Sequence, residues 1–564
     1  MIRHDVVVVG GGLAGLRTAI GLSPQCDVAV ISQVHPVRSH SGSAQGGVNA
    51  ALGNAPEGRD DSPEKHAFET IKGSDYLADQ TAVRMMCQWA PETIDELARF
   101  GAPFSRFPDG TIAQRPFGGA GFPRACYAAD RTGHVLLQTL YEQSVRRRIP
   151  IYAEWAVVRL AVEDHCCHGL IAYDLRHGRL QPVAARVVVL ATGGYGRIYR
   201  NSTNALINTG SGIGTAFLAG LPLKDLEFVQ FHPTTQFGSN ILVTEGARGE
   251  GGFLLNRLGR RFMEDYAPTA MELAPRDIVA RAMQTEIDQG RGFDGGFVHL
   301  DLRHLGREKI CQRLPGIRQI CSDFGGMDPV DAPIPVQPGQ HYCMGGIDVD
   351  MSGQTRATNV YAVGECACVS VHGANRLGGN SLLETLVFGR RAAQAVAQRN
   401  GQPQPGPSEA VVARRLRQVA QQIDRLLGRT GGYPHHRIAD RLKRVLTEKV
   451  GIFRNETDLV EAVAEIRELR GQYQAVQVRT PPGPFQSEIV YALELESLLY
   501  LGEITARGAL ARRESRGSHF RTDFPSRDDA RWLKHTVARL DGDEVQLDDV
   551  HVDVSLYPPV QRTY

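Results

Sequence analysis

The sequence predicts an α/β fold in which a nucleotide-binding sheet is assembled from separated chain segments around an inserted α+β unit. Three observations favour this fold: a buried strand and glycine turn at the N-terminus, two later strand-and-glycine segments, and a cluster of polar motifs between them. At about 150 residues per domain, a chain of 564 residues has room for three or four such units.

The N-terminal window DVVVVGGGLAGLRTAIGL carries the first observation. Its β-branched run is typical of a buried parallel strand, and Gly10, Gly12 and Gly15 follow the pattern G-x-G-x-x-G. A turn of this kind, with a helix expected from about Leu13, lets backbone N–H groups approach a pyrophosphate. The next expected strand, 27–31, leads into Ser32 where a ribose-binding acid is usual, which counts against a nicotinamide cofactor.

Two later segments complete the predicted sheet, ARVVVLATGGYG at 185–196 and NVYAVGEC…FGRRAA at 359–393. FAD-type domains are commonly interrupted in this way. Within the second segment, Ser381 and Glu384 have the spacing of a capping box, so we expect a helix to begin there and to direct its positive end at a ligand.

The predicted insertion contains the candidates for substrate binding. Arginine binds carboxylates bidentately, so several arginines beside histidines and a hydroxyl predict a site for a small anion with more than one carboxylate. Taken singly, each of these residues also fits a structural role, such as a hydrogen-bonded core histidine or a local ion pair. The candidates are His232, Thr244, Glu245, Arg248, Arg276 and His341, together with Arg376 from the second sheet segment.

Several motifs resemble the flavoprotein subunits of succinate dehydrogenase and fumarate reductase: RSHSGSAQGG, HPTT, TEGARGEGG, HYCMGG, GANRLGGNSLLE, RRESRGSHFRTDFPSRDD and the terminal RTY. The resemblance is collinear from residue 5 to residue 564. It implies a Rossmann-like FAD-binding domain interrupted by an α+β capping domain, then a helical domain and a small C-terminal domain. The expected limits are 1–230 and 346–400 for the FAD-binding domain, 231–345 for the capping domain, 408–510 for the helical domain and 511–564 for the C-terminal domain, with a Pro/Gly-rich linker at 400–409.

The resemblance also implies a covalently bound cofactor. His40, in the pliable stretch RSHSGSAQGG, matches the histidine that the family attaches to the flavin of FAD. Small residues around it allow the backbone to wrap a planar ring closely. One departure is Ser211, which stands where the family usually has Asp near the FAD. The other residues expected to contact FAD are Gly10, Gly12, Gly15, Ser32, Ser39, Gln45, Gly46, Gly47, Glu365, Ser381 and Leu382.

The implied reaction is oxidation of succinate to fumarate, with a hydride passing to the flavin. Arg276 matches the residue that moves the proton, with Glu245 and Arg248 as its relay, while His232, Thr244, His341 and Arg376 match the dicarboxylate ligands. Gln45 follows the succinate dehydrogenase pattern, and a neutral side chain there favours that direction by avoiding charge repulsion with reduced flavin. Fumarate reduction, the reverse reaction, stays open.

Composition bears on the partners. A net charge of +1 excludes a nucleic-acid footprint, and the ten cysteines show no repeated Cys-x-x-Cys spacing, so iron–sulfur clusters are expected in another chain. The resemblance implies an iron–sulfur subunit and one or more membrane anchor subunits. We expect no signal peptide and no metal site, and a peripheral protein on the cytoplasmic side of a prokaryotic inner membrane.

Two other functions remain as alternatives. A soluble oxidase resembling L-aspartate oxidase shares the fold, although the R-S-H motif with Gln45 counts against it. A flavin-holding subunit without turnover would be expected to lose its substrate residues, and here they are all present.

Overall fold

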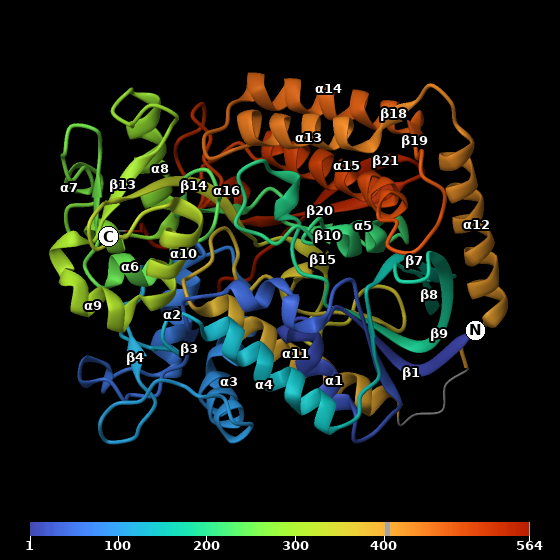
Figure 1. The fold of residues 1–564 in the computed structure, drawn as a ribbon, viewed down its shortest axis with the longest axis horizontal. Helices are drawn as coiled ribbons and strands as arrows, with labels where there is room; N and C mark the ends of the chain where they lie inside the picture. Colours follow the sequence, from blue (N-terminus) through green and yellow to red (C-terminus); the bar gives the residue numbers. More distant parts are fainter. Residues whose placement is uncertain (401–405, 563–564) are drawn as a thin grey trace.

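The computed structural model describes residues 1–400 and 406–562 and confirms the α/β fold (Figure 1). Its largest sheet has seven strands in the order β6-β2-β1-β9-β8-β7, with β16 paired to β9. The pairings among β6, β2, β1, β9 and β16 are parallel, and β7, β8 and β9 form an antiparallel extension. The strands are β1 (Ile2–Val9), β2 (Val28–Ser32), β6 (Ile151–Ala153), β7 (Trp155–Glu163), β8 (Cys166–Asp174), β9 (Arg179–Leu190) and β16 (Val360–Ala362).

The strand register confirms that distant chain segments share this sheet. Val6 of β1 lies opposite Val28 on one side and Val187 on the other, and Val360 of β16 lies opposite Val188. These valines are buried, as expected for a parallel strand covered on both faces. Helices α1 (Leu13–Leu22), α4 (Thr132–Arg146) and α11 (Asn380–Asn400) pack together beside the sheet (Figure 1).

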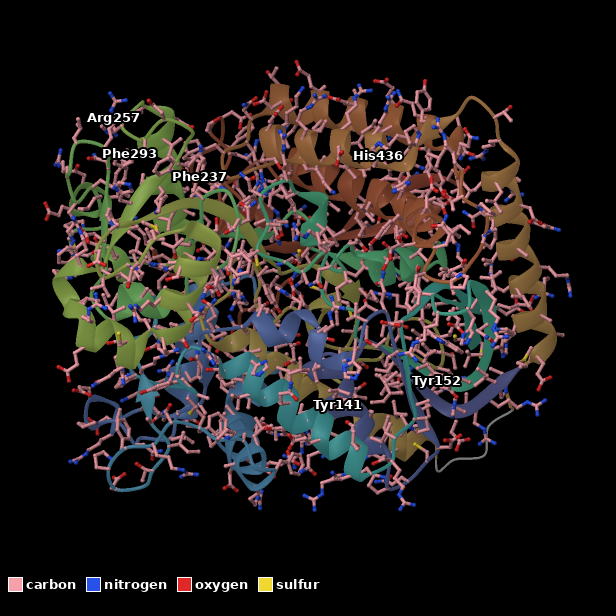
Figure 2. The ribbon with its side chains drawn as sticks, viewed as in Figure 1. Tyr141, Tyr152, Phe237, Arg257, Phe293 and His436 are labelled. Atoms are coloured by element: carbon pink, nitrogen blue, oxygen red, sulfur yellow. The ribbon has the colours of Figure 1, made fainter. Side chains whose placement is uncertain are left out.

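The inserted unit has its own antiparallel sheet in the order β11-β14-β13-β12 and its own hydrophobic core (green to yellow in Figure 1). At its outer end, Phe237 and Phe293 lie near each other (Figure 2). The Phe297 ring centroid lies 4.7 Å from that of Phe237 and 5.2 Å from that of Phe293, which holds the adjoining loops together. The elements are β11 (Val229–Gln236), α6 (Glu245–Gly249), β12 (Phe253–Leu255), α7 (Met263–Tyr266), α8 (Arg276–Asp288), β13 (Val298–Asp301), α9 (Gly306–Arg313), α10 (Pro315–Gly325) and β14 (Ile334–Cys343).

The expected helices of the C-terminal half are present. α12 lies against β7, β8 and β9, and α13, α14 and α15 pack on one another (Figure 1). α15 also packs against α5 (Ser211–Leu218), which brings late-chain residues beside the nucleotide-binding sheet. Positions 401–405 of the predicted linker lie outside the described residues. The helices are α12 (Glu409–Gly428), α13 (His435–Lys449), α14 (Glu456–Tyr473) and α15 (Glu488–Ala511).

The C-terminal segment forms a hairpin of β20 (Lys534–Asp541) and β21 (Glu544–His551). β20 pairs with β10 (Leu223–Lys224), so this segment extends a sheet that begins in the first half of the chain. The domain limits given above stay predictions. The remaining elements are β3 (Val48–Asn49), α2 (Pro63–Gly73), α3 (Gln80–Arg99), β4 (Gln114–Arg115), β5 (Ala125–Cys126), β15 (Gly346–Asp348), β17 (Ala367–Cys368), β18 (Tyr433–Pro434), β19 (Val476–Gln477) and α16 (Asp529–Trp532).

Within the described ranges, no helix is long and apolar enough to cross a membrane. The same ranges contain no group of three or more His, Cys, Asp or Glu side chains placed to hold a metal ion. All ten cysteines are free thiols.

Candidate active site

A cavity of about 890 Å³ is lined by residues of both the nucleotide-binding sheet and the inserted unit. Two of the predicted site residues, Gly15 and Arg248, do not line it. All the others do: Gly10, Gly12, Ser32, Ser39, His40, Gln45, Gly46, Gly47, His232, Thr244, Glu245, Arg276, His341, Glu365, Arg376, Ser381 and Leu382.

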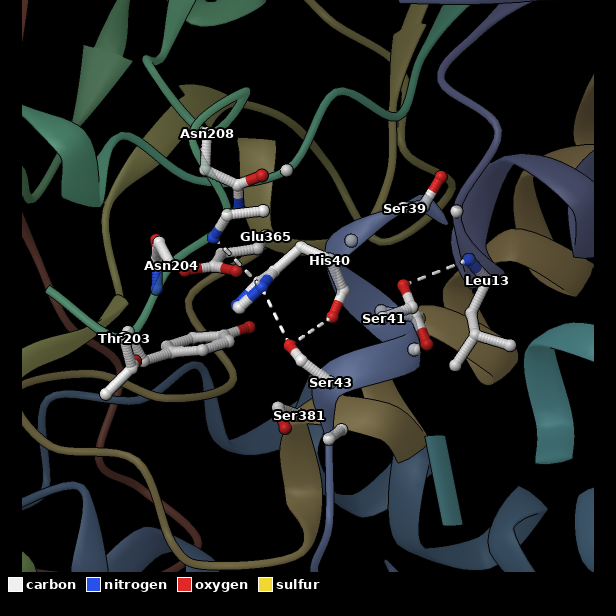
Figure 3. A pocket seen from close by; sticks show the side chains of 18 of the residues that line it. Leu13, Ser39, His40, Ser41, Ser43, Thr203, Asn204, Asn208, Glu365 and Ser381 are labelled. Atoms are coloured by element: carbon white, nitrogen blue, oxygen red, sulfur yellow. Dashed lines mark hydrogen bonds between the residues drawn. The ribbon is translucent and has the colours of Figure 1, made fainter. Parts of the chain in front are cut away.

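The glycine turn after β1 forms one end of the cavity. Gly10 has φ +122°, and a Cβ on it would lie 2.1 Å from the carbonyl oxygen of Ala191. A Cβ on Gly15 would lie 1.9 Å from the carbonyl oxygen of Gly10, so Gly15 allows α1 to pack against the turn. The first turn of α1 is open to the cavity apart from the Leu13 N–H, which donates to Ser41 Oγ at 3.2 Å (Figure 3). A helix N-terminus in this position fits a pyrophosphate.

His40 begins a short 3₁₀ turn, His40–Ser43, on the cavity wall (Figure 3). The Ala205 N–H donates to its Nδ1 at 3.3 Å, and Ser43 Oγ lies 2.9 Å from the same nitrogen. Burial, with a smaller effect from Arg197, lowers the pKa of His40 to about 4. The imidazole is therefore neutral at neutral pH, and its occupied Nδ1 leaves Nε2 for other chemistry.

The small residues after His40 allow close packing. A Cβ on Gly46 would lie 2.7 Å from the Phe117 ring, and one on Gly47 would lie 2.8 Å from the carbonyl oxygen of Cys126. A larger residue at either position would clash with these atoms.

Several polar atoms in the cavity wall lack partners in the described chain. Thr192 Oγ1, Asn208 Nδ2 and Gln45 Oε1 are buried without a hydrogen bond to any described residue. Buried polar atoms normally have a hydrogen-bond partner, so we expect a bound ligand to supply partners for these three. Glu365 accepts from the Cys343 N–H at 3.0 Å, and burial raises the pKa of its carboxyl to about 8. With the glycine turn, these groups fit a dinucleotide such as FAD, which brings phosphates, ribose hydroxyls and a flavin ring.

A carboxyl group that the sequence did not indicate lies behind Ser211. Glu494 of α15 accepts from Gln33 Nε2 at 2.9 Å and from Thr209 Oγ1 at 3.4 Å, and its neighbours also include Ser211. Burial raises the pKa of Glu494 to about 7. An acidic side chain is thus present beside this part of the cavity wall, although residue 211 itself is serine.

The predicted capping box is wrong. α11 begins at Asn380, which places Ser381 inside the first turn, where it lines the cavity. The Glu384 carboxylate instead accepts from Tyr342 Oη at 2.6 Å and lies 2.9 Å from His372 Nε2. These two partners compete for the oxygen that a capping box would use, so tertiary contacts override the local motif.

Glu245 and the two arginines predicted as its relay partners do meet. Arg276 Nε donates to Glu245 Oε2 at 2.7 Å, and the Gly118 N–H donates to Oε1 at 2.6 Å. Arg248 Nη2 lies 4.0 Å from Oε2, on the side away from the cavity. Burial alone would raise the pKa of Glu245, but Arg276 and Arg248 lower it below its usual value, so the carboxylate is charged. The arrangement is a buried Arg–Glu–Arg chain that reaches the cavity at Arg276.

The two predicted histidines lie on adjacent strands, β11 and β14, with ring centroids 4.9 Å apart. Burial and Arg276 lower the pKa of both His232 and His341 well below its usual value. His232 Nδ1 lies 3.2 Å from both the N–H and the carbonyl oxygen of Thr234, so the backbone of Thr234 holds this edge of the neutral ring. A neutral imidazole N–H can donate to a substrate carboxylate without itself exchanging a proton.

Thr244 and Arg376 complete the predicted set. Thr244 caps α6, and its Oγ1 accepts from the Gly246 N–H at 3.2 Å. Arg376 precedes α11, and its guanidinium carbon lies 4.4 Å from the centre of the Tyr342 ring. Burial and the nearby Arg276 lower the pKa of Arg376 to about 9. Two guanidinium groups therefore face one cavity, an arrangement suited to a dicarboxylate.

Sequence reasoning missed Thr192, Asn208 and Glu494. Thr192 stands in the quoted motif ATGG, so its position after a buried strand was a usable signal. No local pattern marks Asn208 or Glu494, because long-range packing alone brings them to the cavity.

The chain is similar to proteins of known families over its whole length. The chain matches the family described as "FAD binding domain" over residues 5–382 and the family described as "Fumarate reductase flavoprotein C-term" over residues 439–564. It is 43% identical to the succinate dehydrogenase flavoprotein subunit of Rickettsia conorii, covering 100% of this chain and 98% of that protein. It is 40% identical to the fumarate reductase flavoprotein subunit of Escherichia coli, covering 100% and 96%.

The fold comparison agrees. A solved structure described as quinol-fumarate reductase with menaquinol molecules superimposes with a TM-score of 0.95 at 39% identity, over 99% of this chain and 100% of that one. Similarity of this extent includes the inserted unit and the helical half.

Proposed function

Because the chain belongs to the family of succinate dehydrogenase and fumarate reductase flavoprotein subunits, we propose that it is a catalytic subunit that oxidises succinate to fumarate. One observation carries the proposal. The buried Arg276–Glu245 pair, the neutral His232–His341 pair and Arg376 all line the cavity that contains the dinucleotide turn. Anion binding, proton transfer and redox chemistry can therefore occur in one enclosed space.

The two substrate carboxylates would bind to the part of the cavity wall that carries a cation and hydrogen-bond donors. Arg376 supplies a bidentate cation, and His232, His341 and Thr244 supply neutral donors. Fixing both carboxylates orients the two methylene carbons, one toward the flavin and the other toward Arg276. Orientation of this kind lowers the barrier by removing the entropy of approach.

Arg276 and Glu245 are assigned to proton transfer. Arginine is a poor base in water, where its pKa lies above about 12. In this cavity Arg276 donates a hydrogen bond to a carboxylate, so the guanidinium can release one of its protons to Glu245 as it takes a proton from the substrate. Arg248, behind Glu245, continues the chain away from the cavity. Bound FAD would supply the hydride acceptor for the neighbouring carbon.

FAD is assigned to the cavity with a covalent bond to His40. The neutral imidazole supports this assignment, since Nε2 of a neutral ring has to lose only one proton to bond carbon, whereas an imidazolium would have to lose two. The turn at Gly10 and Gly12 would hold the pyrophosphate, and Glu365 would accept from the adenosine ribose. Ser32, Ser39, Gln45, Gly46, Gly47, Ser381 and Leu382 would line the remaining contacts, while Gly15 supports the turn from behind.

The electrons taken from succinate would pass from the flavin to partner subunits. We infer a separate iron–sulfur subunit and one or more membrane anchor subunits that lead to quinone, because the described chain carries no cluster-binding cysteine group. The chain would then sit peripherally on the cytoplasmic side of a prokaryotic inner membrane.

Fumarate reduction is the second candidate, because the E. coli relative bears that name. The neutral Gln45 favours succinate oxidation, since a carboxylate beside the flavin would oppose negative charge on its reduced form.

The proposal is tested by anaerobic bleaching of the bound flavin. Succinate added to the purified complex should bleach the visible absorbance, L-aspartate should not, and fumarate should restore colour to a dithionite-reduced sample. Bleaching by L-aspartate would point to the oxidase, and no response to any of the three would point to a flavin-holding subunit without turnover.

A further inference from the structure

Gln230, on β11 two positions before His232, makes four hydrogen bonds that no motif predicts. It is fully buried. Its Oε1 accepts from Arg276 Nη1 at 3.2 Å and from Arg376 Nη2 at 3.1 Å. Its Nε2 donates to Asn375 Oδ1 at 2.9 Å and to the carbonyl oxygen of Arg376 at 2.8 Å.

These contacts set the orientation of the amide. Both partners of Oε1 are pure donors, and both partners of Nε2 present oxygen. Turning the amide over would place its two N–H groups against two guanidinium groups. The side chain therefore has one arrangement, with every donor and acceptor used.

The two arginines come from different parts of the fold. Arg276 begins α8 in the inserted unit, whereas Arg376 precedes α11 beside the nucleotide-binding sheet. The two like charges repel, and a single oxygen between them fixes their separation. Gln230 thus spans the two units at the point where their cations meet.

The neutrality of Gln230 matters as much as its shape. Arg276 already has Glu245 as a carboxylate partner. Arg376 donates to Gln230 and packs on the face of Tyr342, and its Nε is buried without a partner in the described chain. Among the described residues no carboxylate forms a salt bridge with Arg376, and the charge is attracted only by the more distant Glu365 and Glu245 and by Tyr342.

We propose that Gln230 is a positioning residue that holds Arg276 and Arg376 at the separation a dicarboxylate requires while leaving the charge of Arg376 for the substrate. The inference rests on the proposed function. It predicts that charge at position 230 governs dicarboxylate affinity, and that the acceptor oxygen governs the rate of the proton-transfer step.

Two substitutions separate these effects. Gln230→Glu keeps the shape and the acceptor oxygens but adds a negative charge that pairs with Arg376 and repels the ligand. Gln230→Leu keeps much of the volume, removes the acceptor and frees the guanidinium of Arg276 to turn. Matched controls are Gln143→Glu and Gln143→Leu, because Gln143 also accepts from an arginine, Arg147 at 2.6 Å, and does not line the cavity.

The probe is malonate, a dicarboxylate that cannot be oxidised to an alkene, titrated against the flavin spectrum of the purified complex. We expect Gln230→Glu to weaken malonate binding by about tenfold or more, with a reduced salt dependence, at unchanged thermal stability. We expect Gln230→Leu to slow flavin reduction at saturating succinate by about tenfold or more, as a misplaced catalytic group would. The Gln143 variants should match the wild type in both measurements.

Wild-type malonate affinity in Gln230→Glu, or wild-type reduction rate in Gln230→Leu, would overturn the inference while leaving the proposed function intact. A wild-type complex that neither binds malonate nor is bleached by succinate would overturn the proposed function, and the inference with it.

Discussion

The carboxylate of Glu245 holds the guanidinium of Arg276 from the side, with Oε2 2.7 Å from both Nε and Nη2. The two residues begin different helices, α6 and α8, and both are buried. This contact occupies one edge of the guanidinium and leaves Nη1 for Gln230. Arg276 is thereby fixed at the cavity wall with a proton acceptor directly behind it.

Arg276→Lys should stop turnover while retaining flavin. Lysine keeps the charge, but it cannot donate to Glu245 and to Gln230 in the same fork geometry. General acid–base groups contribute about 10²- to 10⁴-fold, so we expect succinate oxidation to fall by at least about 10³-fold. Steady-state rates are read with the flavin content of each preparation. Residual activity within tenfold of the wild type would remove Arg276 from the proton-transfer step.

His40→Ser should leave FAD bound but not attached. The remaining cavity contacts, including the glycine turn, are untouched by the change. Acid precipitation of the variant should release the yellow colour to the supernatant, whereas the wild-type pellet should stay yellow. A yellow pellet from the variant would show that another residue carries the bond.

Glu494→Gln should stabilise the protein at alkaline pH. The folded-state pKa of about 7 lies above the ordinary value of 4.5, so the folded protein binds this proton more tightly than the unfolded chain. The stability of the wild type relative to the variant therefore falls as pH rises from 4.5 to about 7 and is constant above that. The full difference is on the order of 3 kcal/mol, since one pKa unit corresponds to about 1.4 kcal/mol.

The measurement for Glu494 is a series of melting temperatures of the flavin-loaded wild type and variant between about pH 4 and about pH 8.5, a range that brackets the titration from 4.5 to about 7. Two parallel curves would mean that Glu494 keeps an ordinary pKa in the folded protein.

Asp130→Asn should weaken the contact between the nucleotide-binding unit and the inserted unit, which together line the cavity. Asp130 Oδ2 accepts the N–H groups of Gly316 at 2.6 Å and Ile317 at 3.0 Å, at the start of α10. Losing a negative charge at a helix N-terminus costs about 1 kcal/mol. We expect the KM for succinate to rise about fivefold, the factor that such an energy represents, with little change in kcat.

The control for Asp130 is Asp323→Asn, on the exposed side of α10, where the carboxylate accepts from Gln319 Nε2. Limited proteolysis of the inserted unit should also be faster in Asp130→Asn than in either the control or the wild type. Equal KM values and equal cleavage rates would show that this contact does not hold the unit in place.

Local patterns predicted the parts of the molecule whose geometry depends on near neighbours. The β-branched run with its glycine turn predicted β1 and α1. The capping box failed because Glu384 finds stronger partners in Tyr342 and His372, which the local sequence does not reveal. Motif spacing is a safe guide only where no distant side chain competes.

The sequence predicted which kinds of side chain form the candidate site, but it did not predict how those side chains are arranged. Arginines and histidines beside a hydroxyl indicated an anion site, and the family resemblance implied proton transfer through Arg276. Glu494, Gln230 and Asp130 carry no such signal, because each acts on groups from distant parts of the chain.

The family resemblance pointed to His40 as the candidate attachment residue. By itself, the sequence determined the nucleotide-binding sheet, the glycine turn and the chemical character of the substrate wall. These follow from side-chain volume, backbone freedom and charge, which are properties of short segments. Only the tertiary structure decided how the pKa of His40 is lowered, which oxygen separates Arg276 from Arg376, and where a carboxyl lies behind Ser211. Burial and charge–charge distance control those properties, and both depend on residues that fold together from hundreds of positions apart.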